Sequence, residues 1–101
     1  MEKKYFILYL NPARPDFAQT MTDEERNIMM QHIAYWKEYS DNGTMLVFGP
    51  VMDPQGAYGM GIIGVDSEDQ LQGLLKNDPA STINKYEYHP VRAVISPKFN
   101  L

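Results

Sequence analysis

The sequence predicts an α+β fold in which a four-stranded antiparallel sheet carries two helices on one face. Three observations lead to this prediction. The 101 residues are the usual length of one domain with one hydrophobic core. The apolar pattern alternates between short strand-like runs and longer helix-like stripes. These segments follow one another as βαββαβ, an order that most economically builds a ferredoxin-like sandwich.

The chain is expected to open with a strand over residues 4–10. This run is aromatic and aliphatic, and it ends at Asn11-Pro12, a sequence that favours a turn. Residues 11–21 contain two prolines and show no periodicity. We therefore expect a loop there, one that could lie over a pocket or bend around the edge of the sheet.

A helix is predicted over residues 23–42. Thr22 and Glu25 form a capping box at its start, and Asn42-Gly43 supplies the left-handed cap at its end. Between these signals, apolar and aromatic residues recur at spacings of three and four, which is typical of an amphipathic helix. The stripe consists of Ile28, Met29, His32, Tyr35, Trp36 and Tyr39.

The middle of the chain is predicted to form a hairpin. A short apolar run over residues 44–48 is bounded by glycines and indicates a strand. The run 58–65 alternates between two faces and is expected to pair with it across the turn-prone residues 53–56.

A second helix and a last strand complete the order. The helix begins at residues 66–69 and stops at Pro79. Residues 79–84 are ambiguous, whereas 85–95 reads as a long strand that Pro90 places at an edge or a bulge.

Both faces of the first strand are apolar, which a sheet with one face open to water would not show. Something must cover the second face, and a chain of 101 residues has no third layer available. We therefore expect a homodimer in which two sheets face each other. The two sets of side chains are Tyr5, Ile7 and Tyr9 on one face and Phe6, Leu8 and Leu10 on the other.

Composition excludes several classes of function. The net charge of −4 and the scattered cations argue against nucleic acid and anionic membranes as partners. The absence of cysteine excludes disulfides, thiolate catalysis and thiolate-bound metals. The apolar run near the N-terminus is too short for a signal peptide or a membrane span, so we expect a cytoplasmic protein.

Two further motifs have ordinary structural explanations. Residues 59–64 match G-x-G-x-x-G, but they fall inside a strand, where a dinucleotide site needs them in a turn before a helix. Small residues there let another group approach the sheet. Glu87 and His89 share a strand face but lack a third ligand, so we expect neither a metal nor a cofactor.

His32 and Asp78 are the candidates for chemistry. His32 lies on the apolar stripe of the first helix, where its imidazole needs a partner. It is either a hydrogen-bonded structural residue or an acid/base beside a polar pocket. Asp78 is a candidate partner, although an aspartate before Pro79 is also a good cap for a short helix over 79–84.

The order of these motifs resembles the YCII-related (YciI-like) family, and the likeness covers nearly all of residues 1–101 as one domain. The shared features are a helix histidine, Asn42-Gly43, Phe48-Gly49-Pro50-Val51, and a late Asn77-Asp78-Pro79. This resemblance implies a dimeric α/β barrel with His32 and Asp78 as an active-site pair and Gly49-Pro50 shaping the pocket wall. Ala80 departs from the bulky apolar residue usual after Asp-Pro.

The resemblance also implies a class of chemistry. One relative is a dehydrochlorinase of a chlorinated hydroxyhydroquinone, and the wider fold includes muconolactone isomerases. We expect a lyase-like or isomerase-like proton transfer on a small polar or aromatic molecule; the alternative is a non-catalytic small-ligand-binding or regulatory homodimer. Aromatic side chains could line a pocket at the sheet interface of the dimer, with Arg14 as an anion anchor; they are Tyr9, Tyr35, Trp36 and Tyr58.

Overall fold

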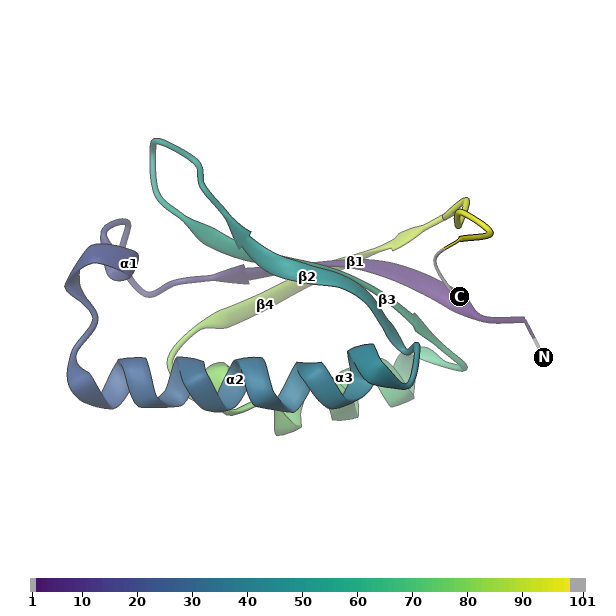
Figure 1. Ribbon diagram of the computed structural model, residues 1–101, viewed down its shortest axis with the longest axis horizontal. Coiled ribbons are helices and arrows are strands. Elements are labelled where there is room, and N and C mark those ends of the chain that lie inside the picture. Colours follow the sequence, from purple (N-terminus) through teal and green to yellow (C-terminus); the bar gives the residue numbers. More distant parts are fainter. Residues whose placement is uncertain (1, 99–101) are drawn as a thin grey trace.

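The computed structural model describes residues 2–98 and contains one four-stranded antiparallel sheet (Figure 1). The strands lie in the order β2-β3-β1-β4, which is the ferredoxin-like arrangement. The fold class predicted from the sequence is confirmed. The elements are β1 (Lys4–Asn11), α1 (Phe17–Thr20), α2 (Asp23–Asp41), β2 (Met45–Val51), β3 (Tyr58–Val65), α3 (Glu68–Asn77), the 3₁₀ helix η1 (Pro79–Thr82) and β4 (Lys85–Val91).

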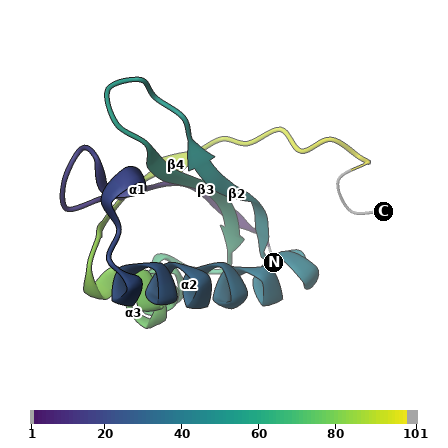
Figure 2. The same cartoon turned by 60° about the vertical axis from the view of Figure 1, so that its left-hand side comes forward.

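Both long helices cover the same face of the sheet (Figure 2). We call this the inner face and the opposite one the outer face. The inner face is the more deeply buried in every strand that alternates, as Leu8 of β1 and Ile63 of β3 show. The core lies between this face and the helices, and its fully enclosed members include Trp36, Leu8, Ile63, Leu71 and Val65.

The capping signals act as predicted on α2. The Thr22 side chain accepts from the Glu25 backbone N–H, and the Glu25 side chain accepts from the Thr22 backbone N–H. At the other end Gly43 has a φ of +86°, the left-handed conformation that glycine adopts without steric cost. These caps fix both ends of the helix that carries His32.

Three segments differ from the prediction by more than one residue. The expected loop 11–21 contains the single turn α1, which Phe17 anchors because its side chain is buried. Strand β2 continues through Pro50, which an edge strand tolerates because one side of its backbone makes no ladder bonds. Strand β4 ends at Val91, not residue 95, because Val91 pairs with Tyr5 near the start of β1 and no partner strand extends further.

The outer face carries a broad set of half-buried apolar side chains. Tyr9 contacts Tyr58 with ring centroids 6.1 Å apart, and His89 of β4 lies beside the same tyrosine. No helix of this chain covers this face in the part of the structure described. Its apolar members on the two central strands are Tyr5, Ile7, Tyr9, Tyr58, Met60 and Ile62.

Among the helices of residues 2–98, none combines the length and the hydrophobicity that a membrane crossing requires.

The core packing predicts a large effect of Leu71→Ala. Leu71 is fully buried, so its truncation should lower the free energy of unfolding by about 2–4 kcal/mol through lost burial and a residual cavity. Urea unfolding followed by circular dichroism measures the change. Met30→Ala, at a side chain that is 69% exposed on α2, should change it by less than about 0.5 kcal/mol. Equal losses in the two variants would contradict the assignment of the core.

Candidate functional site

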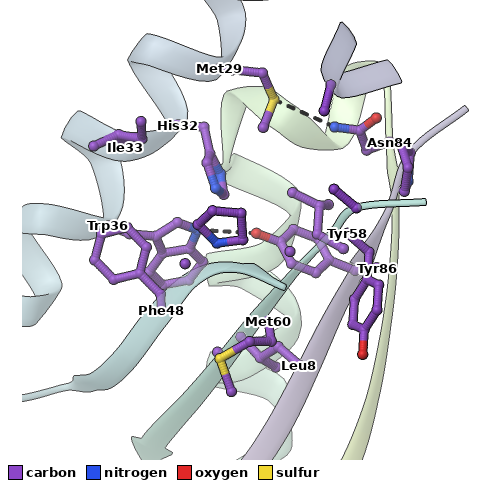
Figure 3. A pocket seen from close by; sticks show the side chains of 18 of the residues that line it. Leu8, Met29, His32, Ile33, Trp36, Phe48, Tyr58, Met60, Asn84 and Tyr86 are labelled. Carbon is purple, nitrogen blue, oxygen red and sulfur yellow. Dashed lines mark hydrogen bonds between the residues drawn. The ribbon is translucent and has the colours of Figure 1, made fainter. Parts of the chain in front are cut away.

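A cavity of about 350 Å³ lies between the inner face of the sheet and α2 (Figure 3). Side chains from α2 form one wall, and β1, β2 and β3 form the opposite wall. Residues of α1 and the end of the β2–β3 hairpin complete its rim. The lining is mostly apolar and includes no lysine, arginine, aspartate or glutamate. Prominent members are Leu8, Phe17, Met29, Ile33, Phe48 and Tyr86.

Glycines in β3 leave room for this cavity. Gly59 and Gly61 pair with Leu10 and Leu8 and therefore belong to the inner face. A Cβ atom on Gly59 would lie 3.1 Å from the Leu10 Cβ, and one on Gly61 would lie 3.3 Å from the Met45 side chain. Gly64 serves the outer face, where the Tyr5 ring lies across it. The glycine pattern thus has the packing role that the sequence analysis preferred to nucleotide binding.

His32 reaches this cavity from the middle of α2. It lies one turn before Trp36 on the helix face that meets the sheet. Figure 3 shows its ring directed into the space between α2 and the sheet. Its side chain is 13% exposed. The imidazole is therefore largely withdrawn from solvent yet forms part of the cavity wall.

The His32 ring contacts Asp78. Nδ1 lies 2.8 Å from Asp78 Oδ2, and the aspartate side chain has no exposed surface. An ionised carboxylate can only accept hydrogen bonds, so Nδ1 carries the proton and donates it. This tautomer leaves Nε2 as the basic ring nitrogen.

Asp78 also caps η1. Its Oδ1 accepts from the Ala80 backbone N–H at 3.0 Å, and Pro79 occupies the first position of the 3₁₀ helix. Asp78 is therefore both a helix cap and the partner of His32: Oδ1 caps η1, and Oδ2 contacts the imidazole. The cap fixes the carboxylate so that Oδ2 points back toward α2.

Two donors that the sequence analysis did not assign to Asp78 complete its environment. Trp36 Nε1 donates to Oδ2 at 2.9 Å, and the Tyr86 hydroxyl of β4 donates to the same oxygen. Figure 3 shows the indole nitrogen joined to the Tyr86 hydroxyl, a contact of 3.0 Å. The sequence gives one indication of such contacts, because a buried indole N–H and a buried tyrosine hydroxyl each need a hydrogen-bond partner.

The pKa of Asp78 reflects two opposing effects. Burial by itself raises it, because burial disfavours the charged form. Hydrogen bonds from His32, Tyr86 and the Ala80 backbone, together with the charge of His32, outweigh burial and hold the pKa below its ordinary value. Asp78 is therefore ionised at neutral pH.

The other residues that the sequence analysis expected at a pocket have different positions. Gly49, Pro50 and Trp36 line the cavity. Tyr58 reaches its rim, although its ring packs against Tyr9 on the outer face. Tyr9 itself does not line the cavity, which lies on the inner side of the sheet and not at the outer face where the aromatic pocket was expected.

Tyr35 and Arg14 are also outside the cavity lining. The Tyr35 hydroxyl donates to the Leu74 carbonyl oxygen at 2.6 Å and thereby ties α2 to α3. Arg14 makes two hydrogen bonds to Glu25, at 3.0 and 2.8 Å, and further bonds to Thr20. The bond from Arg14 and the backbone bond from Thr22 lower the pKa of Glu25 to about 2. Arg14 therefore fastens α1 to the start of α2 and does not serve the cavity as an anion anchor.

Comparison with known proteins identifies one family. The model of the YCII-related domain matches residues 5–95 of the chain. This span begins at the second residue of β1 and extends beyond β4, so it includes both His32 and Asp78. A search of curated protein sequences finds no match.

The Asp78 environment predicts the pH dependence of stability. The pKa of Asp78 is lower in the folded chain than in the unfolded chain, where it is about 4. Its contribution is therefore present above about pH 4 and is lost as the pH falls through the folded-state pKa. Asp78→Asn should lower the free energy of unfolding at pH 7 by about 1–3 kcal/mol.

Urea unfolding at pH 7 and pH 3 tests this prediction. The difference between wild type and Asp78→Asn should shrink at the lower pH. Asp41→Asn, at an exposed position in the last turn of α2, is the matched control. Because a negative charge at a helix C-terminus is unfavourable, this variant should be as stable as wild type or more stable by less than about 1 kcal/mol. A difference that stays constant from pH 7 to pH 3 would show that Asp78 stabilises the fold without its charge.

Proposed function

Because the chain belongs to the YCII-related family and holds His32 against a buried carboxylate beside a cavity, we propose that it is a small enzyme that transfers protons on a small polar or aromatic molecule. The observation that carries the proposal is the 2.8 Å contact between His32 Nδ1 and Asp78 Oδ2 at the cavity wall. His32 acts as the acid/base, and Asp78 orients it. The chemistry is of the lyase or isomerase type.

The geometry supports this division of roles. Asp78 accepts the hydrogen bond from the Nδ1–H group, so Nε2 is the nitrogen that takes a proton from a ligand. When it does, the positive charge on the imidazole forms beside a fixed negative charge in a region of low dielectric constant. Asp78 is held as an anion by its other donors and leaves the proton on the ring. Among the side chains, an imidazole is suited to exchange protons near neutral pH.

The cavity supports a small ligand. Its volume of about 350 Å³ is at the lower end for small-molecule sites, and its walls are largely apolar. His32 and the amide of Asn84 are among its few polar side chains. A compact molecule with an apolar body and one acidic proton fits this lining.

The proposal includes a homodimer formed through the outer face. The exposed side of the sheet presents tyrosine, isoleucine and methionine side chains on both central strands, a composition typical of an interface. Val47 on the edge strand is 40% exposed beside them. A second copy of the same face would cover these residues, while the cavity on the inner face stays accessible in each copy.

Replacement of His32 by glutamine tests the catalytic role. Glutamine keeps a polar side chain of similar size but cannot exchange protons near neutral pH. We expect the turnover of small phenols and lactones that the wild type converts to fall by about 100-fold or more, with affinity changed only a few-fold. Kinetic assays and isothermal titration calorimetry measure the two quantities.

His89→Gln, on the outer face, is the matched control and should retain turnover. If His32→Gln keeps its turnover, the acid/base proposal is wrong. If it loses binding instead, or if the wild type binds these compounds without converting them, the protein is a ligand-binding dimer.

Replacement of Ile62 by glutamate tests the dimer. Ile62 pairs with Ile7 on the outer face, so a charge there should convert a dimer into a folded monomer. Sedimentation velocity measures the mass, and circular dichroism confirms folding. Met30→Glu, at an exposed position on α2, should leave the mass unchanged. A wild type that sediments as a monomer would refute the sheet-to-sheet dimer.

A further inference from the structure

A single oxygen of Asp78 receives three side-chain donors. His32 Nδ1 lies at 2.8 Å and Trp36 Nε1 at 2.9 Å, and the Tyr86 hydroxyl donates to the same Oδ2 atom. The other oxygen accepts only the backbone N–H of Ala80 at 3.0 Å among the described residues. The indole N–H and the tyrosine hydroxyl thus donate to the same oxygen that accepts the hydrogen bond from His32.

Donors on a shared oxygen compete for its charge. An oxygen of an ionised carboxylate offers about two lone-pair directions, so three donors divide its accepting capacity. Each hydrogen bond to the charged form also stabilises that form. The hydrogen bond from His32 to Oδ2 is therefore weaker when the Trp36 indole and the Tyr86 hydroxyl also donate to this oxygen.

We propose that Tyr86 and Trp36 are positioning residues that act on His32 through Asp78, by limiting how much of the carboxylate charge reaches the imidazole. The electrostatic link stands by itself, whereas its consequence for turnover rests on the proposed function. Both residues keep Asp78 ionised and in place while His32 gains and loses its proton. Neither residue needs to touch the proton that is transferred.

The two donors come from different parts of the fold. Trp36 belongs to α2, one turn after His32, and therefore moves with it. Tyr86 belongs to β4 and connects the carboxylate to the sheet. Burial and the bond to Asp78 raise the pKa of Tyr86 above its ordinary value. Its hydroxyl thus keeps its proton throughout the range in which an imidazole titrates and is a permanent donor.

Few titratable groups surround this cluster. Asp78 faces His32 from the turn before η1, and Tyr86 faces the same carboxylate from β4. Tyr35 on α2 lies against Trp36, and Tyr58 on β3 reaches the cavity rim. Met29 and Ile33 are the lining neighbours on α2 itself, and the cavity lining from β1, β2 and α1 is uncharged. A shift in the His32 titration on removal of the Tyr86 hydroxyl would therefore arise through Asp78.

Tyr86→Phe tests the link directly. It removes the hydroxyl and keeps the ring, so more of the carboxylate charge acts on His32 and stabilises the imidazolium. The midpoint of the His32 titration, followed by NMR of the imidazole signals in the protein without ligand, should rise by about 0.5–1 pH unit relative to wild type. His89 on the outer face is an internal reference whose midpoint should stay unchanged.

Tyr88→Phe is the matched control. Tyr88 lies two residues along the same strand, and its hydroxyl donates to Glu68 and accepts from Gln72, both of α3. This variant should leave the His32 midpoint where it is in wild type. Trp36→Phe, which removes the indole N–H, should raise the midpoint as Tyr86→Phe does and provides a second variant if Tyr86→Phe does not fold.

The outcomes separate this inference from the proposed function. If the folded Tyr86→Phe or Trp36→Phe variant moves the His32 midpoint no more than Tyr88→Phe does, or lowers it, the positioning role is refuted, whatever the turnover. If the midpoint rises but His32→Gln retains turnover, the link stands and the catalytic proposal fails. If the midpoint rises and the acidic limb of the pH–rate profile moves to higher pH with it, both hold.

Discussion

A single buried carboxylate is the constraint on which the rest of this structure depends. Asp78 is 1% exposed, and an isolated ion at such a place would cost several kcal/mol. Its donors come from α2, from β4 and from the backbone of η1. The helix, the last strand and the short turn between them must therefore keep their relative positions for the charge to stay satisfied. This requirement fixes the surroundings of His32 before any ligand binds.

The same arrangement explains why the cavity is where it is. Two glycines in β3 line the cavity without side chains, and the aliphatic residues of β1 do not fill the space. The sheet is thus less tightly packed where it faces His32 of α2. Because the walls are apolar, the His32–Asp78 contact is shielded from water, which strengthens the effect of the carboxylate on the ring. The position of the cavity beside His32 therefore has two consequences: the core is less tightly packed there, and the carboxylate acts more strongly on the imidazole.

The two faces of the sheet differ in their surroundings. The inner face buries the core and borders the cavity, whereas the outer face presents tyrosines and isoleucines with little of this chain above them. Strand alternation produces this division, since neighbouring residues point to opposite sides. A change on the outer face can therefore leave the contacts of His32 intact. Likewise, the network around Asp78 can be altered without a change to the side chains of the outer face.

The sequence alone determined the fold class, the order of the main helices and strands, and the two residues of greatest chemical interest. Periodicity and capping signals are local, so the ends of α2 and the strand β3 could be predicted from neighbouring residues. His32 stood out because a histidine on an apolar stripe needs a partner. The tertiary structure alone decided that this partner is Asp78, 46 residues away, and that Tyr86 and Trp36 share it. It also placed the cavity under the inner face and bound Arg14 to Glu25. These features depend on strand register and helix packing, which join residues distant in sequence and leave no local periodic signal.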